Sequence, residues 1–324
     1  MSKTTIEWTQ ESLNPTAGCS IVSPGCKNCY AMRIAHRIQH NPKLADGAYR
    51  GVTKKAKTGP VWTGRVNLSQ GALMRPLRWR KPRLVFVNSM SDLFHESLTS
   101  AQIARVWAVM AIAKKHTFQV LTKRPQKMLD WLSDPATRLT VELAMRAIDP
   151  TVKLETWPLP NVWCGASVED QRRAEERIPI LLRLPAAVRF LSMEPLLGPV
   201  DLSIVIKKRD FKKLDWVIVG GESGPKSRPM HPEWARQIRD ICIQHDVRFF
   251  FKQVGSWRWV ATSEATGWLD RAGKMSDILV KGWQGIRYGP KKLAGRKLDG
   301  RYWEQMPPPK GSLPAAALQR RKAA

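Results

Sequence analysis

The chain has 324 residues and carries 54 Lys and Arg against 27 Asp and Glu, a formal net charge of +27. Hydrophobic residues make up 43% of it, enough to bury a sizeable core, so the composition excludes wholesale disorder. No run of about 18 apolar residues occurs and the first eight residues have no apolar signal region, so we expect a cytoplasmic protein without a membrane span.

The first notable feature is a cysteine loop that follows an expected strand near residues 6–8. Cys19, Cys26 and Cys29 are separated by six and then two residues. In a reducing compartment such crowding favours metal or cluster ligation over disulfides. A closed zinc site takes four protein ligands, whereas a cubane iron–sulfur cluster can use three thiolates and leave one iron open. We predict a 4Fe–4S cluster here; the alternative is zinc, with His36 as the fourth ligand.

A helix is expected over residues 30–38, and a basic stretch comes after it. Residues 47–91 contain ten cations and no acid, with Trp62 and Trp79 among them. Such a field attracts polyanions, and Trp rings can stack on bases. We expect this stretch to bind nucleic acid, the alternative being a solvated basic face. The cations predicted to make the contacts are Lys54, Lys55, Lys57, Arg65, Arg78 and Arg80.

Short apolar runs then alternate with helical patterns. Expected strands cover residues 84–87, 117–121, 162–166, 188–192, 216–219 and 247–251. Strands that alternate with helices indicate a parallel sheet, and continuous apolar strands indicate burial on both faces. We predict an α/β fold: a complete or partial TIM-like (β/α) barrel of six to seven parallel strands. A doubly wound open sheet is the alternative.

The intervening helices carry their own boundary signals. Ser100 is expected to cap one helix, Pro179 to interrupt a helix that starts near Asp170, and Pro232 to lie at the start of another. Cys164 and Cys242 lie in apolar patterns, where a free cysteine packs as a small hydrophobe.

Composition also suggests the domain organisation. Residues 1–255 form the expected barrel domain, with an insertion near 134–160 that contains a helix over 139–148. Residues 256–306 are expected to form a Trp-rich, basic C-terminal extension packed on the barrel. Residues 307–324 are expected to form a flexible basic tail.

Polar residues follow most of the expected strands. In a TIM-like barrel the carboxyl ends of the strands carry the active site. The residues we expect to be catalytic are Asp92, Lys123, Arg124 and Glu194, where the Lys–Arg pair would grip a carboxylate or phosphate. Ser167 and a glycine-rich turn that can approach a ligand closely are expected to bind a cofactor; the turn comprises Gly220, Gly221, Glu222 and Ser223.

Over roughly residues 5–255 the chain resembles an uncharacterised phage- and prophage-associated family of three-cysteine proteins. Three clustered cysteines after the first strand of a barrel also resemble the radical S-adenosylmethionine (radical SAM) superfamily. The motifs that carry the resemblance are Asn14-Pro15 with Gly18-Cys19, Ser23-Pro24-Gly25-Cys26-Lys27-Asn28-Cys29-Tyr30-Ala31, Ser91-Asp92-Leu93-Phe94-His95, Leu121-Thr122-Lys123-Arg124-Pro125, Glu194-Pro195-Leu196-Leu197 and Gly220-Gly221-Glu222-Ser223-Gly224.

The superfamily implies that the three cysteines hold the cluster and that the open iron chelates S-adenosylmethionine. Reductive cleavage would then yield a 5′-deoxyadenosyl radical that abstracts hydrogen from the substrate, with Tyr30 in contact with the adenine. This chain departs from the superfamily pattern in its first cysteine gap of six residues, in Asn28 before the third cysteine, and in the late position of Gly220-Gly221-Glu222.

Three functions therefore stand as hypotheses. The first is a radical SAM-like enzyme that modifies or repairs a base of a nucleic acid or nucleotide. This hypothesis includes a possible partner protein, and a base in a duplex would have to be extruded. The second is a non-enzymatic, zinc- or cluster-containing nucleic-acid-binding protein. The third is a hydrolytic barrel that uses Asp92, Glu194 and Glu222 with a divalent metal.

Overall fold

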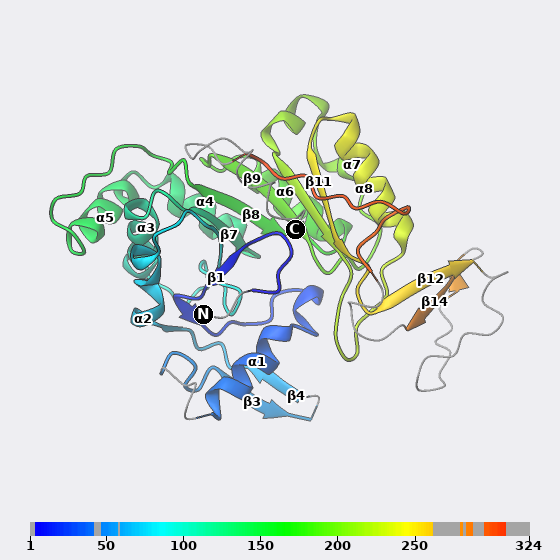
Figure 1. Cartoon of the computed structure of the whole chain (residues 1–324), viewed down its shortest axis with the longest axis horizontal. Coiled ribbons are helices and arrows are strands. Elements are labelled where there is room, and N and C mark those ends of the chain that lie inside the picture. Colours follow the sequence, from blue (N-terminus) through cyan, green and yellow to red (C-terminus); the bar gives the residue numbers. More distant parts are fainter. Residues whose placement is uncertain are drawn as a thin grey trace.

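The chain folds around one seven-stranded parallel sheet (Figure 1). The computed structural model describes residues 4–41, 47–57, 59–261, 279–280, 283–287 and 295–308. The strands lie side by side in chain order: β1 (Glu11–Leu13), β6 (Leu84–Val87), β7 (Thr117–Thr122), β8 (Val162–Ser167), β9 (Val188–Met193), β10 (Trp216–Gly220) and β11 (Arg248–Gln253).

This order decides between the expected architectures. Because the order never reverses, the doubly wound sheet is excluded. In the described part of the chain β1 and β11 are the two edges and do not pair, so the sheet is an α/β half-barrel. The partial TIM-like barrel is confirmed and the complete barrel is wrong.

The strands form because their side chains are buried on both faces. Every residue of β8 and β10 is buried. Along β10, Val217 and Val219 belong to the large core cluster that includes the helices, whereas Trp216 and Ile218 point into a second cluster of mainly aromatic side chains. That second cluster comprises Trp8, Phe86, Trp163, Val188, Phe190, Trp216, Ile218 and Phe250.

Trp8 explains why the first strand was misplaced. We expected a strand near residues 6–8, but β1 begins at Glu11 and Trp8 lies in a turn. The indole is 3% exposed and packs against Phe86, with ring centroids 4.7 Å apart. An aromatic side chain inserted into the aromatic cluster thus mimics the burial of a strand residue.

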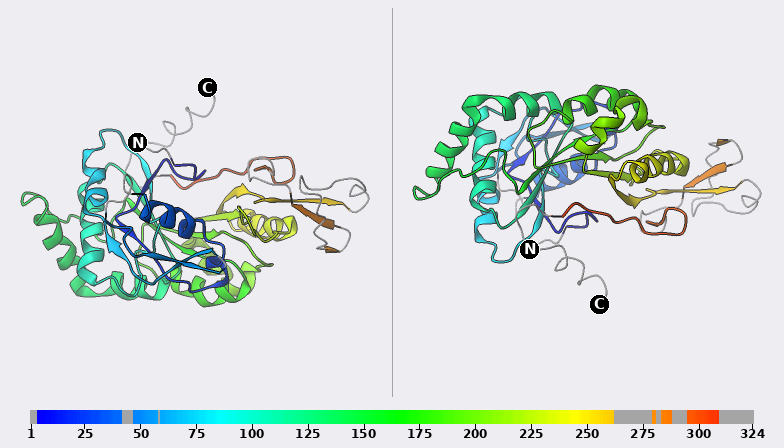
Figure 2. Two further views of the ribbon diagram at one scale, coloured as in Figure 1. Left: turned by 90° about the horizontal axis from the view of Figure 1, so that it is seen from below. Right: turned by 90° about the horizontal axis from the view of Figure 1, so that it is seen from above.

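Six longer helices accompany the sheet: α1 (Tyr30–Gln39), α3 (Ser100–Ile112), α4 (Pro125–Ser133), α5 (Pro135–Arg146), α6 (Gln171–Leu181) and α8 (Pro232–Gln244). Figure 2 shows the helices of residues 100–181, coloured cyan to green, gathered along one face of the sheet. Short turns of helix occur at η1 (Pro24–Cys26), α2 (Gln70–Leu73), η2 (Arg75–Arg78), α7 (Leu202–Val205) and η3 (Lys208–Lys213).

Three expected helix boundaries need correction. The cap of α3 is Thr99 rather than Ser100, because Thr99 and Gln102 form a reciprocal capping box. The inserted helix begins at residue 135 instead of 139, since Asp134 accepts a hydrogen bond from Ala136 N–H. Pro179 lies inside α6, which ends two residues later, so the proline is accommodated in the last turn.

The structure also contains antiparallel pairs of strands outside the main sheet, which the sequence did not predict. A hairpin of β3 (Thr53–Ala56) and β4 (Gly59–Trp62) packs on α1, and β2 (Thr16–Ala17) pairs with β5 (Asn67–Leu68). After β11, β12 (Trp257–Ala261) and β13 (Leu279–Val280) both pair with β14 (Trp283–Arg287).

Only part of the expected C-terminal extension belongs to the described residues. The returning segment 295–308 lies along β11, where Phe251 N–H donates to Trp303 O at 2.8 Å and Gln305 N–H to Phe249 O at 3.2 Å. This segment therefore covers the edge strand of the sheet. About half of the expected Trp-rich region and residues 309–324 of the expected tail lie outside the described residues.

Two further expectations were tested. Cys164 and Cys242 are 2% and 1% exposed and belong to the large core cluster, as predicted. Within the described ranges, every helix is too short or too polar to span a membrane.

Gly165 of β8 offers a test of the sheet packing. A Cβ there would lie 2.5 Å from the ring of Phe190 on the neighbouring strand, so we expect Gly165→Ala to lower the free energy of unfolding by ~1–3 kcal/mol through overpacking. In Gly71→Ala, the matched control in α2, the new Cβ meets nothing within 4 Å and should cause no loss. Urea unfolding measures both; equal stability of the two variants would contradict the packing argument.

Candidate functional site

The cysteine loop, residues 14–29, leaves the carboxyl end of β1 and lies at the edge of the sheet where all seven parallel strands end. Gly18 determines the path of this loop. Gly18 N–H donates to Met90 O at 3.1 Å, next to the end of β6. Its φ is +105°, and a Cβ would lie 2.1 Å from Arg65 O, so only glycine fits. Cys19 is thereby placed beside the end of β6.

The first anchor of the loop is an ion pair at the ends of β6 and β7. Asp92 is 6% exposed and accepts hydrogen bonds from Thr122 Oγ1 at 2.6 Å and from Arg124 Nη1 at 3.0 Å. The other Arg124 Nη donates to Ser20 Oγ at 2.7 Å. Ser20 follows Cys19, so this pair holds the first cysteine in place.

The second anchor is Glu169, two residues after the end of β8 and fully buried. It accepts hydrogen bonds from Gly25 N–H at 3.3 Å and from the Ser23 hydroxyl, and it pairs with Arg177 at 3.0 Å. Burial alone would raise the pKa of this carboxyl, but Lys123 and Arg177 hold the pKa below its ordinary value of 4.5.

The third anchor is Glu222, after β10. Arg228 grips it with two nitrogens, at 2.6 and 2.9 Å, and also donates to Pro24 O at 3.0 Å. Asn28 Nδ2 donates to Glu222 at 3.0 Å and to Lys226 O at 2.8 Å. The residue before the third cysteine is therefore fixed by the glycine-rich turn.

This turn has a packing reason for its glycines. A Cβ on Gly221 would lie 1.9 Å from Val254 O, and one on Gly220 would lie 3.1 Å from the Glu194 carboxylate. Ser223 is half-buried, and Ser167 is buried with its carbonyl oxygen accepting from Arg177 at 2.8 Å. The predicted cofactor-binding residues thus lie at the correct edge, but Glu222 and the two glycines are engaged within the protein.

The three thiols form one electrostatic group. Cys26 is buried, Cys19 and Cys29 are half-buried, and Cys29 interacts with both other thiols. Burial raises the pKa of Cys19 to about 12 and also raises the pKa of Cys29. Arg124 beside Cys19 and Lys123 beside Cys29 oppose these shifts. Thiolates, and not thiols, ligate metals. A positively charged ligand would therefore stabilise the deprotonated form of these buried sulfurs.

The spacing of the side chains limits which kind of metal centre the three thiols can hold. Among the residues that the structure describes, no three His, Cys, Asp or Glu side chains are close enough together to hold a single metal ion. A four-iron cluster is larger than one ion and its thiolate ligands stand further apart, so the donor set still suits it. His36 follows Cys29 by seven residues along α1, about 10 Å. Its Nδ1 lies 3.1 Å from Thr53 Oγ1 on β3.

The fourth rim carboxylate, Glu194 after β9, is also paired. It accepts from Trp8 Nε1 at 3.1 Å and pairs with Lys252 at 2.5 Å. Tyr30, next to Cys29, donates its hydroxyl to Ser89 O at 3.3 Å and leaves its side chain 44% exposed. The tyrosine ring is therefore an accessible aromatic surface beside the thiols.

The predicted nucleic-acid-binding residues fall into separate groups. Lys54, Lys55 and Lys57 are exposed on the β3–β4 hairpin, and Arg65 is exposed in the loop beyond it. Arg78 and Arg80 are exposed near η2, at the amino-terminal edge of the sheet.

The prediction that tryptophans in this stretch stack on bases is wrong. Trp62 and Trp79 are 8% and 7% exposed because each packs into a core cluster.

The sequence placed Glu169 among the polar residues expected at the rim, because it closely follows a buried strand, but assigned it no role. It gave no indication of Arg177 or Arg228. Arg177 lies in the middle of α6 and Arg228 in an irregular loop, so neither position carries a local signal.

Comparison with known proteins gives one match. The model of the family described as "Protein of unknown function (DUF5131)" matches residues 3–307. No curated protein and no solved structure matches the chain. The family match carries neither a phage association nor a likeness to radical SAM enzymes.

Glu169→Gln tests the second anchor. The substitution leaves Arg177 and Lys123 without their buried counter-charge, so we expect a loss of about 3 kcal/mol in the free energy of unfolding and faster amide exchange over residues 19–29. Glu175→Gln, an exposed acid on α6, is the control and should change stability by less than ~0.5 kcal/mol. Unchanged exchange in Glu169→Gln would show that this carboxylate does not hold the loop.

The same carboxyl predicts a pH dependence. Its folded pKa is lowered, so its stabilisation is complete above the ordinary value of 4.5 and is lost as the pH falls through the folded pKa. The stability difference between wild type and Glu169→Gln should therefore narrow below about pH 4. Urea unfolding across a pH series measures this, and a constant difference would refute the lowered pKa.

Proposed function

Since the chain belongs to the DUF5131 family of unknown function, we propose a function from its own site: an iron–sulfur, radical SAM-like enzyme that modifies or repairs a nucleic-acid or nucleotide substrate. The observation that carries this proposal is the threefold anchoring of a loop with three thiols at the carboxyl edge of a half-barrel. The motif resemblance adds the phage or prophage setting and the SAM cofactor.

The anchoring matters because reactive sites need fixed geometry. Three ion pairs, each with a buried carboxylate, hold Ser20, Gly25 and Asn28, each adjacent to one cysteine. Desolvating such pairs is expensive, and their retention is understandable where a site must be preorganised. A loop that only closed a connection between β1 and α1 would not need them.

Cys19, Cys26 and Cys29 are the residues that would hold the cluster, and when bound it supplies one-electron reduction. The residues around it have distinct parts in this proposal. Arg124 and Lys123 offset negative charge at Cys19 and Cys29. The exposed ring of Tyr30 offers a stacking surface for the adenine of S-adenosylmethionine.

A polar pocket of about 410 Å³ adjoins the loop and gives the substrate a place. Its lining includes Val22 of the cysteine loop, the cations Lys123 and Lys127, and the acids Glu96 and Glu176. The ammonium of Lys127 already donates to His95 O and Leu98 O, so the ammonium of Lys123 is the group that would bind a substrate phosphate close to the thiols. In this arrangement Lys123 contacts the substrate, whereas Asp92 and Arg124 position the loop.

The hydrolytic hypothesis gains no support from the carboxylates. Asp92, Glu194 and Glu222 follow three different strands, and each is already paired with its own cation: Arg124, Lys252 and Arg228 respectively. A divalent ion would have to displace these partners. The non-enzymatic hypothesis differs from the proposal only in the metal and its reactivity, so metal analysis separates the two.

The test is anaerobic reconstitution of the full chain with iron and sulfide. We expect roughly four irons per chain, an electron paramagnetic resonance signal that changes when S-adenosylmethionine is added, and formation of 5′-deoxyadenosine on reduction. Alanine at Cys19, Cys26 or Cys29 should each abolish stoichiometric iron binding, because one ligand is lost.

Cys242→Ala is the matched control, since this thiol is buried in the core and should not affect iron content. A single bound zinc, or iron retained in all three loop variants, would overturn the cluster. A cluster without 5′-deoxyadenosine would overturn the radical SAM part alone.

A further inference from the structure

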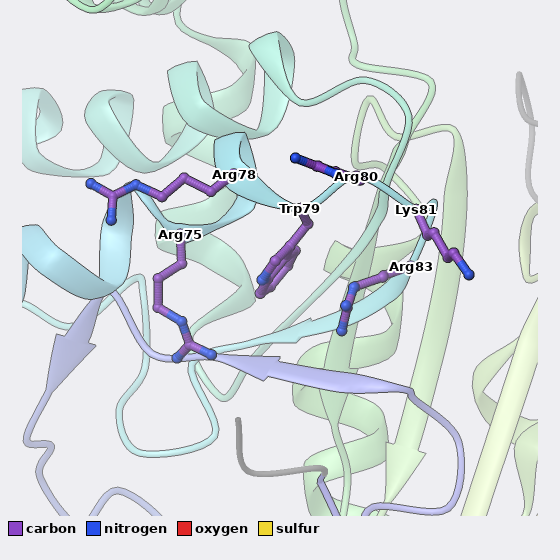
Figure 3. A pocket seen from close by; sticks show the side chains of 6 residues that line it. All are labelled: Arg75, Arg78, Trp79, Arg80, Lys81 and Arg83. Atoms are coloured by element: carbon purple, nitrogen blue, oxygen red, sulfur yellow. The ribbon is translucent and has the colours of Figure 1, made fainter.

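A recess of about 480 Å³ lies at the opposite edge of the sheet from the cysteines. Its position follows from the topology, because Arg83 immediately precedes β6 and pairs with Glu11, the first residue of β1. The lining consists of five cations and one aromatic side chain, shown in Figure 3: Arg75, Arg78, Trp79, Arg80, Lys81 and Arg83.

The charge of this recess is largely uncompensated. Arg83 pairs with Glu11, whereas the other four cations have no carboxylate partner among the described residues. Arg83 Nε is buried and donates to no atom of the described chain. Because that nitrogen is buried, the exposed guanidinium groups of Arg78 and Arg80 are the donors that an anionic ligand in the recess can reach.

Trp79 gives the recess a fixed shape. Its indole lies 5.8 Å from the Arg75 guanidinium and 5.2 Å from that of Arg83, at the distance of cation–π contacts. The indole also meets the ring of His116 nearly at a right angle, with ring centroids 5.5 Å apart. Because both guanidinium groups lie over a buried ring, the ring holds charge in place and does not stack on a base.

We infer that this recess binds the sugar–phosphate backbone of a single nucleic-acid strand, without reading its sequence. Guanidinium forks match phosphate oxygens, and phosphate contacts carry no base specificity. The inference rests on the nucleic-acid substrate of the proposed function. It adds a second contact, remote from the thiols, that only a polymer can use.

The distance between the two edges sets the minimum length of that polymer. The six residues of β7 extend about 20 Å. At ~3.4 Å per stacked nucleotide, a strand needs roughly six nucleotides to reach from the recess to the cysteine loop. A free nucleotide reaches only one of the two sites.

The test is fluorescence anisotropy with labelled single-stranded DNA of about 20 and about 4 nucleotides. Arg78→Glu combined with Arg80→Glu should weaken binding of the longer strand at least about tenfold and lower the salt dependence of the affinity. Lys207→Glu combined with Lys208→Glu makes the same charge change at two exposed residues near η3 and should cost less than about threefold. The short strand should bind weakly to all forms.

Equal losses in the two double variants would overturn the inference, since the general field of the protein would then explain the binding. Equal affinity for the short and the long strand would also overturn the inference. A recess variant that loses binding to anionic phospholipid vesicles but keeps its affinity for DNA would overturn it as well. DNA binding is measured without added metal. Repeating the measurement with Cys19→Ala distinguishes a failure of this inference from a failure of the proposed function. Retained DNA affinity in that variant supports the recess even where cluster assembly fails.

Discussion

The hydrogen bonds that join the cysteine loop to three ion pairs at the rim of the sheet are the interaction on which the site depends. Glu169 is fully buried and would be unfavourable there without Arg177, Lys123 and the amide of Gly25. The loop supplies part of the solvation that the carboxylate has lost, and the carboxylate in turn fixes the loop. The same reciprocity holds for Arg124 with Ser20 and for Glu222 with Asn28. Loop and rim are therefore one unit.

This unit changes how the polar rim should be interpreted. A row of acids after successive parallel strands is typical of an active site in which carboxylates act directly. Here each of these acids has a cationic partner, so the groups left to meet a ligand are the thiols, the ring of Tyr30 and Lys123, whose contact with Glu169 is long at 3.9 Å. This distribution agrees with the proposal that chemistry at this edge comes from a group that the thiols hold.

The interior of the half-barrel separates the two ends of the molecule. Trp8, Trp163 and Trp216 fill it together with phenylalanines from three strands, so no ligand can pass through the sheet. A polymer that contacts both the cysteine edge and the recess around Trp79 must follow the outer surface. The positive charge of the chain suits such a path, because a long anion gains from contacts spread over the surface.

How far the fold could be predicted depended on whether a signal was local. Apolar runs such as Leu84–Val87 predict a strand because both faces of such a strand are buried. All six strands expected from residue 84 onward are present. Trp8 misled because an inserted aromatic has the burial of a strand residue. The stretch around Trp62 and Trp79 misled for a related reason: residues adjacent in sequence were taken as one surface, although β3–β4 packs on α1 and η2 lies near the start of β6.

Local pattern was thus sufficient for the class of fold and for the edge at which the three thiols and the rim carboxylates gather, because burial and the direction of parallel strands follow from neighbouring residues. Three-dimensional packing alone settled that the sheet stays open, that the carboxylates serve as anchors, and that the basic residues divide between opposite edges. Those outcomes depend on contacts between segments up to about two hundred residues apart, such as Asn28 with Lys226, which no local pattern can encode.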